Sequence, residues 1–112
     1  CSDSLTDFYP RPPNPQKRAF RDTSNTKHVC WDLLGVESNT ATYMSFATVA
    51  GLPTESMPAL PTTRQYNGVS PPDDRPWFVV LGASDIDGDL ELGYMVTSSL
   101  QPGSVHVENE GE

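Results

Sequence analysis

Three aspartates at alternate positions have the spacing that points most clearly to chemistry. They are Asp85, Asp87 and Asp89, within the run Asp-Ile-Asp-Gly-Asp. Carboxylates at this spacing can surround a hard cation when the loop curls, because Ca²⁺ takes about six to eight oxygen ligands. The EF-hand pattern is absent, since Leu90 replaces its glycine and Val96 its last glutamate. Two interpretations stay open: a hairpin tip that uses Asp and Gly for its turn, or a calcium site, with no other cofactor expected.

In one version of the calcium interpretation, the ion lies between two subunits of an assembly. A cation bound at these aspartates could be shared across a contact between subunits, because one loop supplies only part of the oxygen ligands that Ca²⁺ takes. Asp73 and Asp74 are the candidates for the additional ligands.

Catalysis by a nucleophile or by paired acids finds little support in the sequence. Asp22-Thr23-Ser24 has the composition of an aspartic-protease motif, but residues 18–21 are not the apolar strand that seats such an aspartate. A turn with an Asx-type hydrogen bond is expected there instead. Ser84 lacks the second glycine of a nucleophile elbow, and neither His28 nor His106 has a partner at metal-ligand spacing. We therefore expect no catalytic residues and no enzyme.

One aromatic side chain is a candidate for ligand binding. Tyr66 precedes the turn signal Asn67-Gly68, which predicts an exposed position. Trp77 and Tyr94 fall in strand-like runs, so we assign them to packing. Tyr66 is therefore the residue that we expect to contact a glycan or another ligand.

Charge is distributed unevenly along the chain, whose formal net charge is −8. Residues 1–64 hold equal numbers of basic and acidic side chains, whereas residues 65–112 hold one basic residue, Arg75, against nine acids. Such a segment repels phosphate backbones, so we expect no nucleic-acid partner. Five cations lie between positions 11 and 27, and we expect them to face acidic neighbours. No apolar stretch reaches the roughly 20 residues of a membrane span.

The two cysteines give little indication of their state. Cys1 and Cys30 could pair, but two cysteines define neither a disulfide framework nor metal-ligand spacing. Cys30 lies between Val29 and Trp31, which indicates a buried thiol in a strand. We expect a reduced or redox-indifferent setting. Because the first residue is Cys1 rather than Met, we also expect a piece of a longer protein.

Prolines and apolar periodicity divide the chain into the elements that must position these residues. Four prolines between positions 10 and 15 predict an irregular, extended segment over 1–26. Asp87-Gly88 predicts a hairpin turn. No segment has a sustained 3.6-residue period, so we expect no substantial helix. Alternating or continuous apolar runs predict strands at 27–34, 40–49, 62–66, 77–81, 90–97 and 104–107.

These elements predict an all-β fold, an antiparallel β-sandwich or partial jelly roll with long proline-rich loops. We expect an extended proline-rich arm over 1–26, a β-sandwich domain over 27–107 and an acidic disordered tail over 108–112. The continuous apolar run 77–81 predicts a strand buried on both faces. The second faces of two strands, at Met44/Phe46 and Phe78/Val80, carry more apolar surface than a thin sandwich hides. Burial of this surface against a partner predicts a homo-oligomer.

The C-terminal third resembles a known family. Residues 77–82, an acidic turn and residues 88–96 are similar to the last two strands of jelly-roll coat proteins of non-enveloped, positive-strand RNA viruses of the tombusvirus, sobemovirus and nodavirus kind. The resemblance covers residues 77–98. It implies a self-assembling capsid protein of the virion, some relatives of which hold calcium between subunits through aspartates. The chain is shorter than an eight-stranded jelly roll, which implies a protrusion domain, a cleaved portion or a reduced sandwich.

Two function classes follow from these observations. The first is a structural coat or protrusion domain that forms a dimer or larger capsid assembly and attaches to a host receptor. The second is an extracellular β-sandwich recognition module that binds carbohydrate or a protein receptor.

Overall fold

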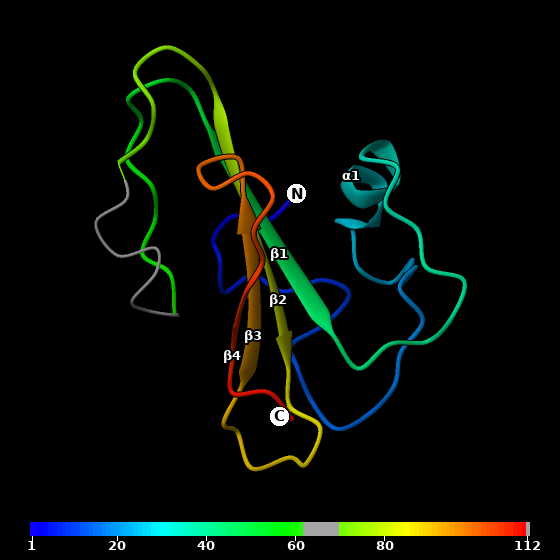
Figure 1. The fold of residues 1–112 in the computed structure, drawn as a ribbon. Coiled ribbons are helices and arrows are strands. Elements are labelled where there is room, and N and C mark those ends of the chain that lie inside the picture. Colours follow the sequence, from blue (N-terminus) through cyan, green and yellow to red (C-terminus); the bar gives the residue numbers. More distant parts are fainter. Residues whose placement is uncertain (62–69, 112) are drawn as a thin grey trace.

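The computed structural model describes residues 1–61 and 70–111 (Figure 1). Four strands form one antiparallel sheet in chain order, and one short helix lies beside β1, on the side away from β4. The elements are α1 (His28–Leu33), β1 (Ser45–Gly51), β2 (Trp77–Ser84), β3 (Gly93–Ser98) and β4 (His106–Glu108). The all-β prediction is confirmed at the level of a four-stranded sheet. Within the described ranges no helix is long and apolar enough to cross a membrane.

The two faces of the sheet differ in how far other parts of the chain bury them. The inner face carries Val79 and Leu81 of β2, which are fully buried and pair with Val49 and Ala47 of β1. Side chains from the loops complete this core. Its buried members are Leu5, Trp77, Val79, Leu81 and Val96, against which Phe8, Val49, Met57, Leu60, Tyr94 and Leu100 pack.

The outer face carries the alternate side chains of the same strands. Phe78 belongs to it and is 48 % exposed, so the prediction that the run 77–81 is buried on both faces is wrong at this position. Successive side chains of a strand point to opposite faces, and the cover of the outer face does not extend over Phe78.

The predicted hairpin of residues 77–97 is confirmed. β2 pairs with β3 in antiparallel register, with Leu81 opposite Val96. The second strand begins at Gly93 rather than Leu90, because Leu90 has a φ of +72° and is exposed. A left-handed residue does not continue a strand, so the connecting loop is longer than the Asp-Gly signal alone suggests.

The strand predicted at 27–34 is wrong, because the chain forms α1 there. Gly35, with a φ of +69°, ends the helix in a Schellman motif. Its N–H donates to the carbonyl of Asp32 at 3.0 Å, and the N–H of Val36 donates to that of Trp31 at 3.3 Å. Six residues are too few to show a helical period in the sequence.

The reduced thiol expected at Cys30 is also wrong. Cys1 and Cys30 form a disulfide with a Cα–Cα distance of 5.2 Å. This bond ties the first residue to α1 at the edge of a second buried cluster, made of Tyr9, Phe20 and Trp31, against which Cys1 packs. A sequence separation of 29 hides this proximity from any local pattern.

Residues 1–26 contain no helix and no named strand, but they belong to the folded body. Tyr9 exchanges two backbone hydrogen bonds of 2.7 Å with Phe46, which extends the sheet beyond β1 by an isolated bridge. A second bridge joins Arg18 to Thr42. Leu5 enters the inner core, so the segment expected as an arm covers the sheet instead.

Three further expectations concern the remaining strands. The strand expected at 40–49 begins at Ser45, and the strand expected at 104–107 is β4, which includes Glu108 from the expected tail. The strand expected at 62–66 lies outside the described residues, as does Tyr66.

Candidate functional site

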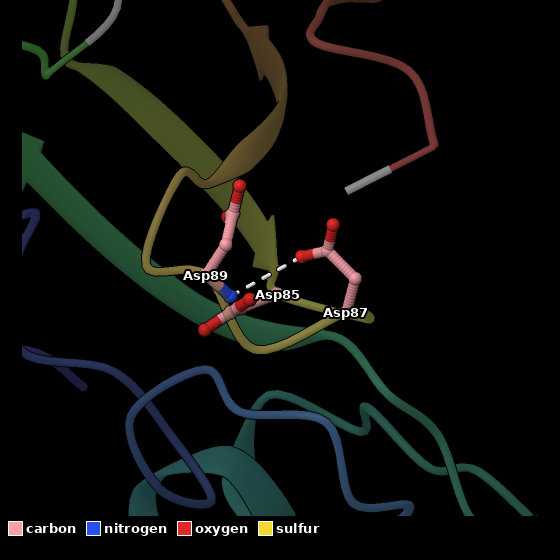
Figure 2. Close-up of side chains that lie close together, drawn as sticks. All are labelled: Asp85, Asp87 and Asp89. Carbon is pink, nitrogen blue, oxygen red and sulfur yellow. Dashed lines mark hydrogen bonds between the residues drawn. The ribbon is translucent and has the colours of Figure 1, made fainter.

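The structure brings together the three aspartates that the sequence singles out. They lie in the acidic loop, residues 85–92, which connects β2 to β3 (Figure 2). One carboxylate oxygen of each residue lies within 4.8 Å of those of the other two. Asp85 is buried, at 1 % exposure, whereas Asp87 and Asp89 are exposed. The acidic loop is thus the candidate metal centre among the described residues.

Hydrogen bonds give each aspartate a structural role in the loop. The Asp85 carboxylate accepts from the N–H of Gly88 at 2.8 Å. The Asp87 carboxylate accepts from the N–H of Asp89 at 3.2 Å (Figure 2). Asp89 accepts from the N–H of Glu91 at 2.8 Å. The bonds accepted by Asp87 and Asp89 are Asx turns, whereas the bond accepted by Asp85 spans three residues. The interpretation of Asp and Gly as turn residues is therefore confirmed.

Gly88 is needed in the loop for two reasons. Its φ is +81°, a conformation that other residues rarely adopt. A Cβ at this position would lie 3.2 Å from Cγ of Pro15. The acidic loop therefore packs closely against the proline-rich segment.

The three carboxylates fit a calcium ion only in part. Each uses one oxygen for its turn, and together they offer three ligand atoms where Ca²⁺ takes about six to eight. Asp73 and Asp74 cannot complete the shell within one chain, because they precede β2 whereas the acidic loop follows it. A strand of eight residues is about 26 Å long. Water or a second molecule would have to supply the remaining oxygens.

For a weak calcium site we assume a dissociation constant of about 1 mM. Calcium at about 10 mM, roughly ten times this value, should then stabilise the fold by about 1.4 kcal/mol. For a domain of this size the melting temperature would rise by about 5 °C. Differential scanning calorimetry at constant ionic strength measures the shift. Asp89→Asn should abolish it and Asp74→Asn should not. If calcium does not change the melting temperature of the wild type, the loop is a turn that binds no calcium.

Asp22, the other aspartate considered from the sequence, lies in the predicted Asx turn. Its carboxylate accepts from the N–H of Ser24 at 3.0 Å and from Nε of Arg11 at 2.8 Å. The side-chain hydrogen bond from Ser24, followed by that from Arg11, lowers the pKa of Asp22 to about 2. The turn prediction is confirmed, and the group stays ionised at neutral pH.

Three of the five basic side chains of residues 11–27 face acidic neighbours, as predicted. Arg11 pairs with Asp22, and Arg21 pairs with Asp32 at 3.2 Å. Lys27 forms ion pairs with two further aspartates, Asp3 and Asp7. Lys17 lies over the ring of Tyr43, 5.2 Å from its centroid.

An apolar pocket, which the sequence does not indicate, lies between α1 and the outer face of the sheet. Its volume is about 300 Å³. It depends on α1 and on the turn after it, and neither was expected from the sequence. The apolar side chains of its wall come from five segments and are Phe20, Trp31, Leu34, Val36, Phe46 and Val80.

The aromatic residues assigned to packing lie in the inner core. Trp77 is 2 % exposed, and Tyr94 packs against the same cluster. Burial, followed by the nearby charge of Glu108, raises the pKa of the Tyr94 hydroxyl.

Comparison of the chain with protein-family models, with curated proteins and with solved structures finds no match.

Proposed function

We propose that this chain is a structural domain that acts by self-association, as its resemblance to viral coat proteins implies. The observation that carries the proposal is an apolar patch on the outer face. The outer patch consists of Phe78, Val80, Met95 and Val107. Phe78 is 48 % exposed, and Met95 and Val107 are each 41 % exposed.

Three strands contribute to the outer patch. Met95 of β3 lies opposite Val107 of β4 and, across the other edge of its strand, opposite Gly82 of β2. Gly82 leaves room beside Met95, and the methyl group of Met44 fills part of it. A small pocket of about 210 Å³, lined in part by Met44, Met95 and Val107, forms a depression in this surface. A side chain of another apolar surface can insert into such a depression.

A second copy of the chain is the partner that we propose for the outer patch. Two such faces placed against each other form two packed sheets about 10 Å apart. The β-sandwich expected from the sequence would then form between copies. Apolar burial contributes about 25 cal/mol per Å², so a contact that removes a few hundred Å² gains several kcal/mol before the costs of association.

Met95→Lys tests this contact. In a symmetric pair each substitution occurs twice, so we expect the dissociation constant of the dimer to rise by at least about tenfold. Sedimentation equilibrium over a range of concentrations measures it. Leu33→Lys is the matched control, because Leu33 is 83 % exposed on α1 and lies outside the patch. A wild-type chain that stays monomeric at high concentration contradicts self-association.

The Cys1–Cys30 disulfide favours a second candidate function. Disulfides persist in oxidising, extracellular settings, which suits an extracellular module that recognises carbohydrate or a protein receptor. Tight binding to a glycan array by a monomeric chain supports this candidate over assembly. Location in the virion belongs to the first proposal, and an extracellular location belongs to the second.

A further inference from the structure

We infer that the outer edge of β4 pairs with the β4 of a second copy, so that two sheets join into one. This contact rests on the proposed self-association but is separate from the outer patch, because it is made by backbone groups. Three observations carry it: the direction of the backbone groups of Val107, the contrast between the two edges of the sheet, and the order of the polar side chains along β4.

The backbone of Val107 presents its N–H and C=O groups to the outside of the sheet. The N–H of Ser99 donates to the carbonyl of Phe78 at 3.1 Å, so these two residues form a hydrogen-bonded pair. Such pairs recur at every second position of an antiparallel ladder, which makes Gly82 and Met95 another one. The backbone groups of Met95 therefore point toward β2, and those of Val107, which lies opposite Met95 on β4, point away from β3.

No other part of the described chain pairs with these two groups. β4 is the last strand of the sheet (Figure 1). Within residues 1–61 and 70–111, neither the N–H nor the C=O of Val107 has a hydrogen-bond partner. Val107 is 41 % exposed, so another strand can approach this edge. An unpaired donor and acceptor on an edge strand are a template for pairing with a strand of another molecule.

The opposite edge of the sheet is covered by the chain itself over much of its length. On β1, Phe46 exchanges two backbone hydrogen bonds with Tyr9. The N–H of Thr48 donates to Oγ of Ser2 at 3.2 Å. The segment 104–110 around β4 has no such cover in the described structure, and it contains neither the proline nor the lysine that often protects an edge strand. Of the two edges, β4 is therefore the one open to a partner strand.

The side chains of β4 identify a second copy as the partner strand. β4 overlaps fully with the β4 of another copy when their Val107 residues lie opposite each other across a two-fold axis. His106 of each copy then lies opposite Glu108 of the other, because the two strands run in opposite directions. Within one chain Nε2 of His106 lies 2.8 Å from Oε1 of Glu108. Two such pairs in reversed order form an alternating row of imidazole and carboxylate groups, which favours this register.

Pairing at β4 also enlarges the apolar surface of the outer face. Residues that lie opposite each other in an antiparallel pair project to the same face of the sheet, so Val107 of both copies lies on the outer face. The two outer patches then become continuous across a joined sheet, which contains the four strands of each chain. The edge contact thus extends the surface that the face-to-face contact would use.

Amide hydrogen exchange, followed by ¹H–¹⁵N NMR over a range of protein concentrations, tests the edge contact. We expect exchange of the Val107 N–H to slow at least about tenfold when copies associate. Ala50 is the matched control. It is an exposed residue of β1, and its N–H also points outward, because Phe78 opposite it is bonded to Ser99. Its exchange should stay fast at every concentration.

The same measurement separates the edge contact from the outer patch. If the chain associates and the exchange of Val107 does not slow, the edge contact is overturned and the outer patch remains the contact. If the chain does not associate at any concentration, self-association and the edge contact are both overturned.

Val107→Pro removes the outward N–H without breaking a hydrogen bond between β3 and β4. We expect the dissociation constant of the dimer to rise at least about tenfold. Val107→Thr is the matched control, because threonine keeps the N–H and the branched shape, and we expect it to raise the dissociation constant less than about threefold. Sedimentation equilibrium measures both values. Equal effects of the two substitutions overturn the pairing through the backbone.

A cysteine cross-link tests the register and removes no backbone group. In the proposed pair the Cα atoms at position 107 of the two copies are about 5.5 Å apart, which suits a disulfide. Position 105 is exposed as well, but its two copies would be about 13 Å apart along the strands. Val107→Cys should therefore form a covalent dimer on a non-reducing gel, and Val105→Cys should not. Equal cross-linking of the two variants, or none with Val107→Cys, overturns the proposed pairing.

Discussion

Loss of the disulfide between Cys1 and Cys30 is expected to lower the free energy of unfolding by about 3 to 4 kcal/mol. The bond closes a loop between residues 29 apart in sequence, so its removal restores the conformational entropy of this loop to the unfolded chain. Urea unfolding with and without a reductant measures the difference. The double variant Cys1→Ser/Cys30→Ser should unfold at the midpoint of the reduced wild type and should not respond to the reductant.

The same experiment has a local consequence at α1. A helix of six residues is not stable alone in water, so α1 depends on its packing and on the disulfide. We expect the emission of Trp31 to shift to the red on reduction, before the sheet unfolds. Identical unfolding midpoints of the oxidised and reduced chains would show that packing alone holds the N-terminal segment.

Tyr9→Ala is expected to destabilise the chain by about 3 to 5 kcal/mol. Tyr9 is 1 % exposed, its ring packs between Phe20 and Trp31, and its hydroxyl accepts from the N–H of Asp22 at 3.1 Å. The substitution removes a large side chain from the centre of the second cluster, and the backbone bridge to β1 would limit the collapse of the cavity. Thermal or urea unfolding gives the value.

Two variants serve as controls for this prediction. Tyr9→Phe keeps the ring and removes only the hydroxyl, so we expect a loss of about 1 to 2 kcal/mol from the unpaired N–H of Asp22. Tyr43→Ala removes a partly exposed ring and should cost less than Tyr9→Ala. A small effect of Tyr9→Ala would mean that residues 1–26 act as a detachable arm, as the prolines suggest, and not as part of the core.

Local patterns in the sequence are enough to predict part of this structure. The hairpin of β2 and β3 follows from alternating apolar residues around Asp-Gly, because strand pairing across a turn is set by neighbours in the chain. The Asx turn at Asp22 is predicted in the same way. The proximity of Asp85, Asp87 and Asp89 also follows from their spacing in one loop.

Other features depend on contacts between distant segments. The side chains at positions 29–31 are typical of strands, yet this segment forms the helix α1. In the helix, Cys30 is bonded to Cys1 and Trp31 stacks on Tyr9. The proline content of residues 10–15 indicates an absence of regular structure. It does not indicate that Leu5, Tyr9 and Phe20 on either side are buried.

The strand-rich fold, the central hairpin and the acidic loop can be predicted from the order of residues alone, because apolar periodicity and turn residues act over a few positions. Three features emerge only when the chain is folded: which face of the sheet is covered, the pairing of Cys1 with Cys30, and the pocket beside Trp31. Each of these depends on residues far apart in the chain. Their meeting reflects the packing of the whole chain, which a local pattern does not encode.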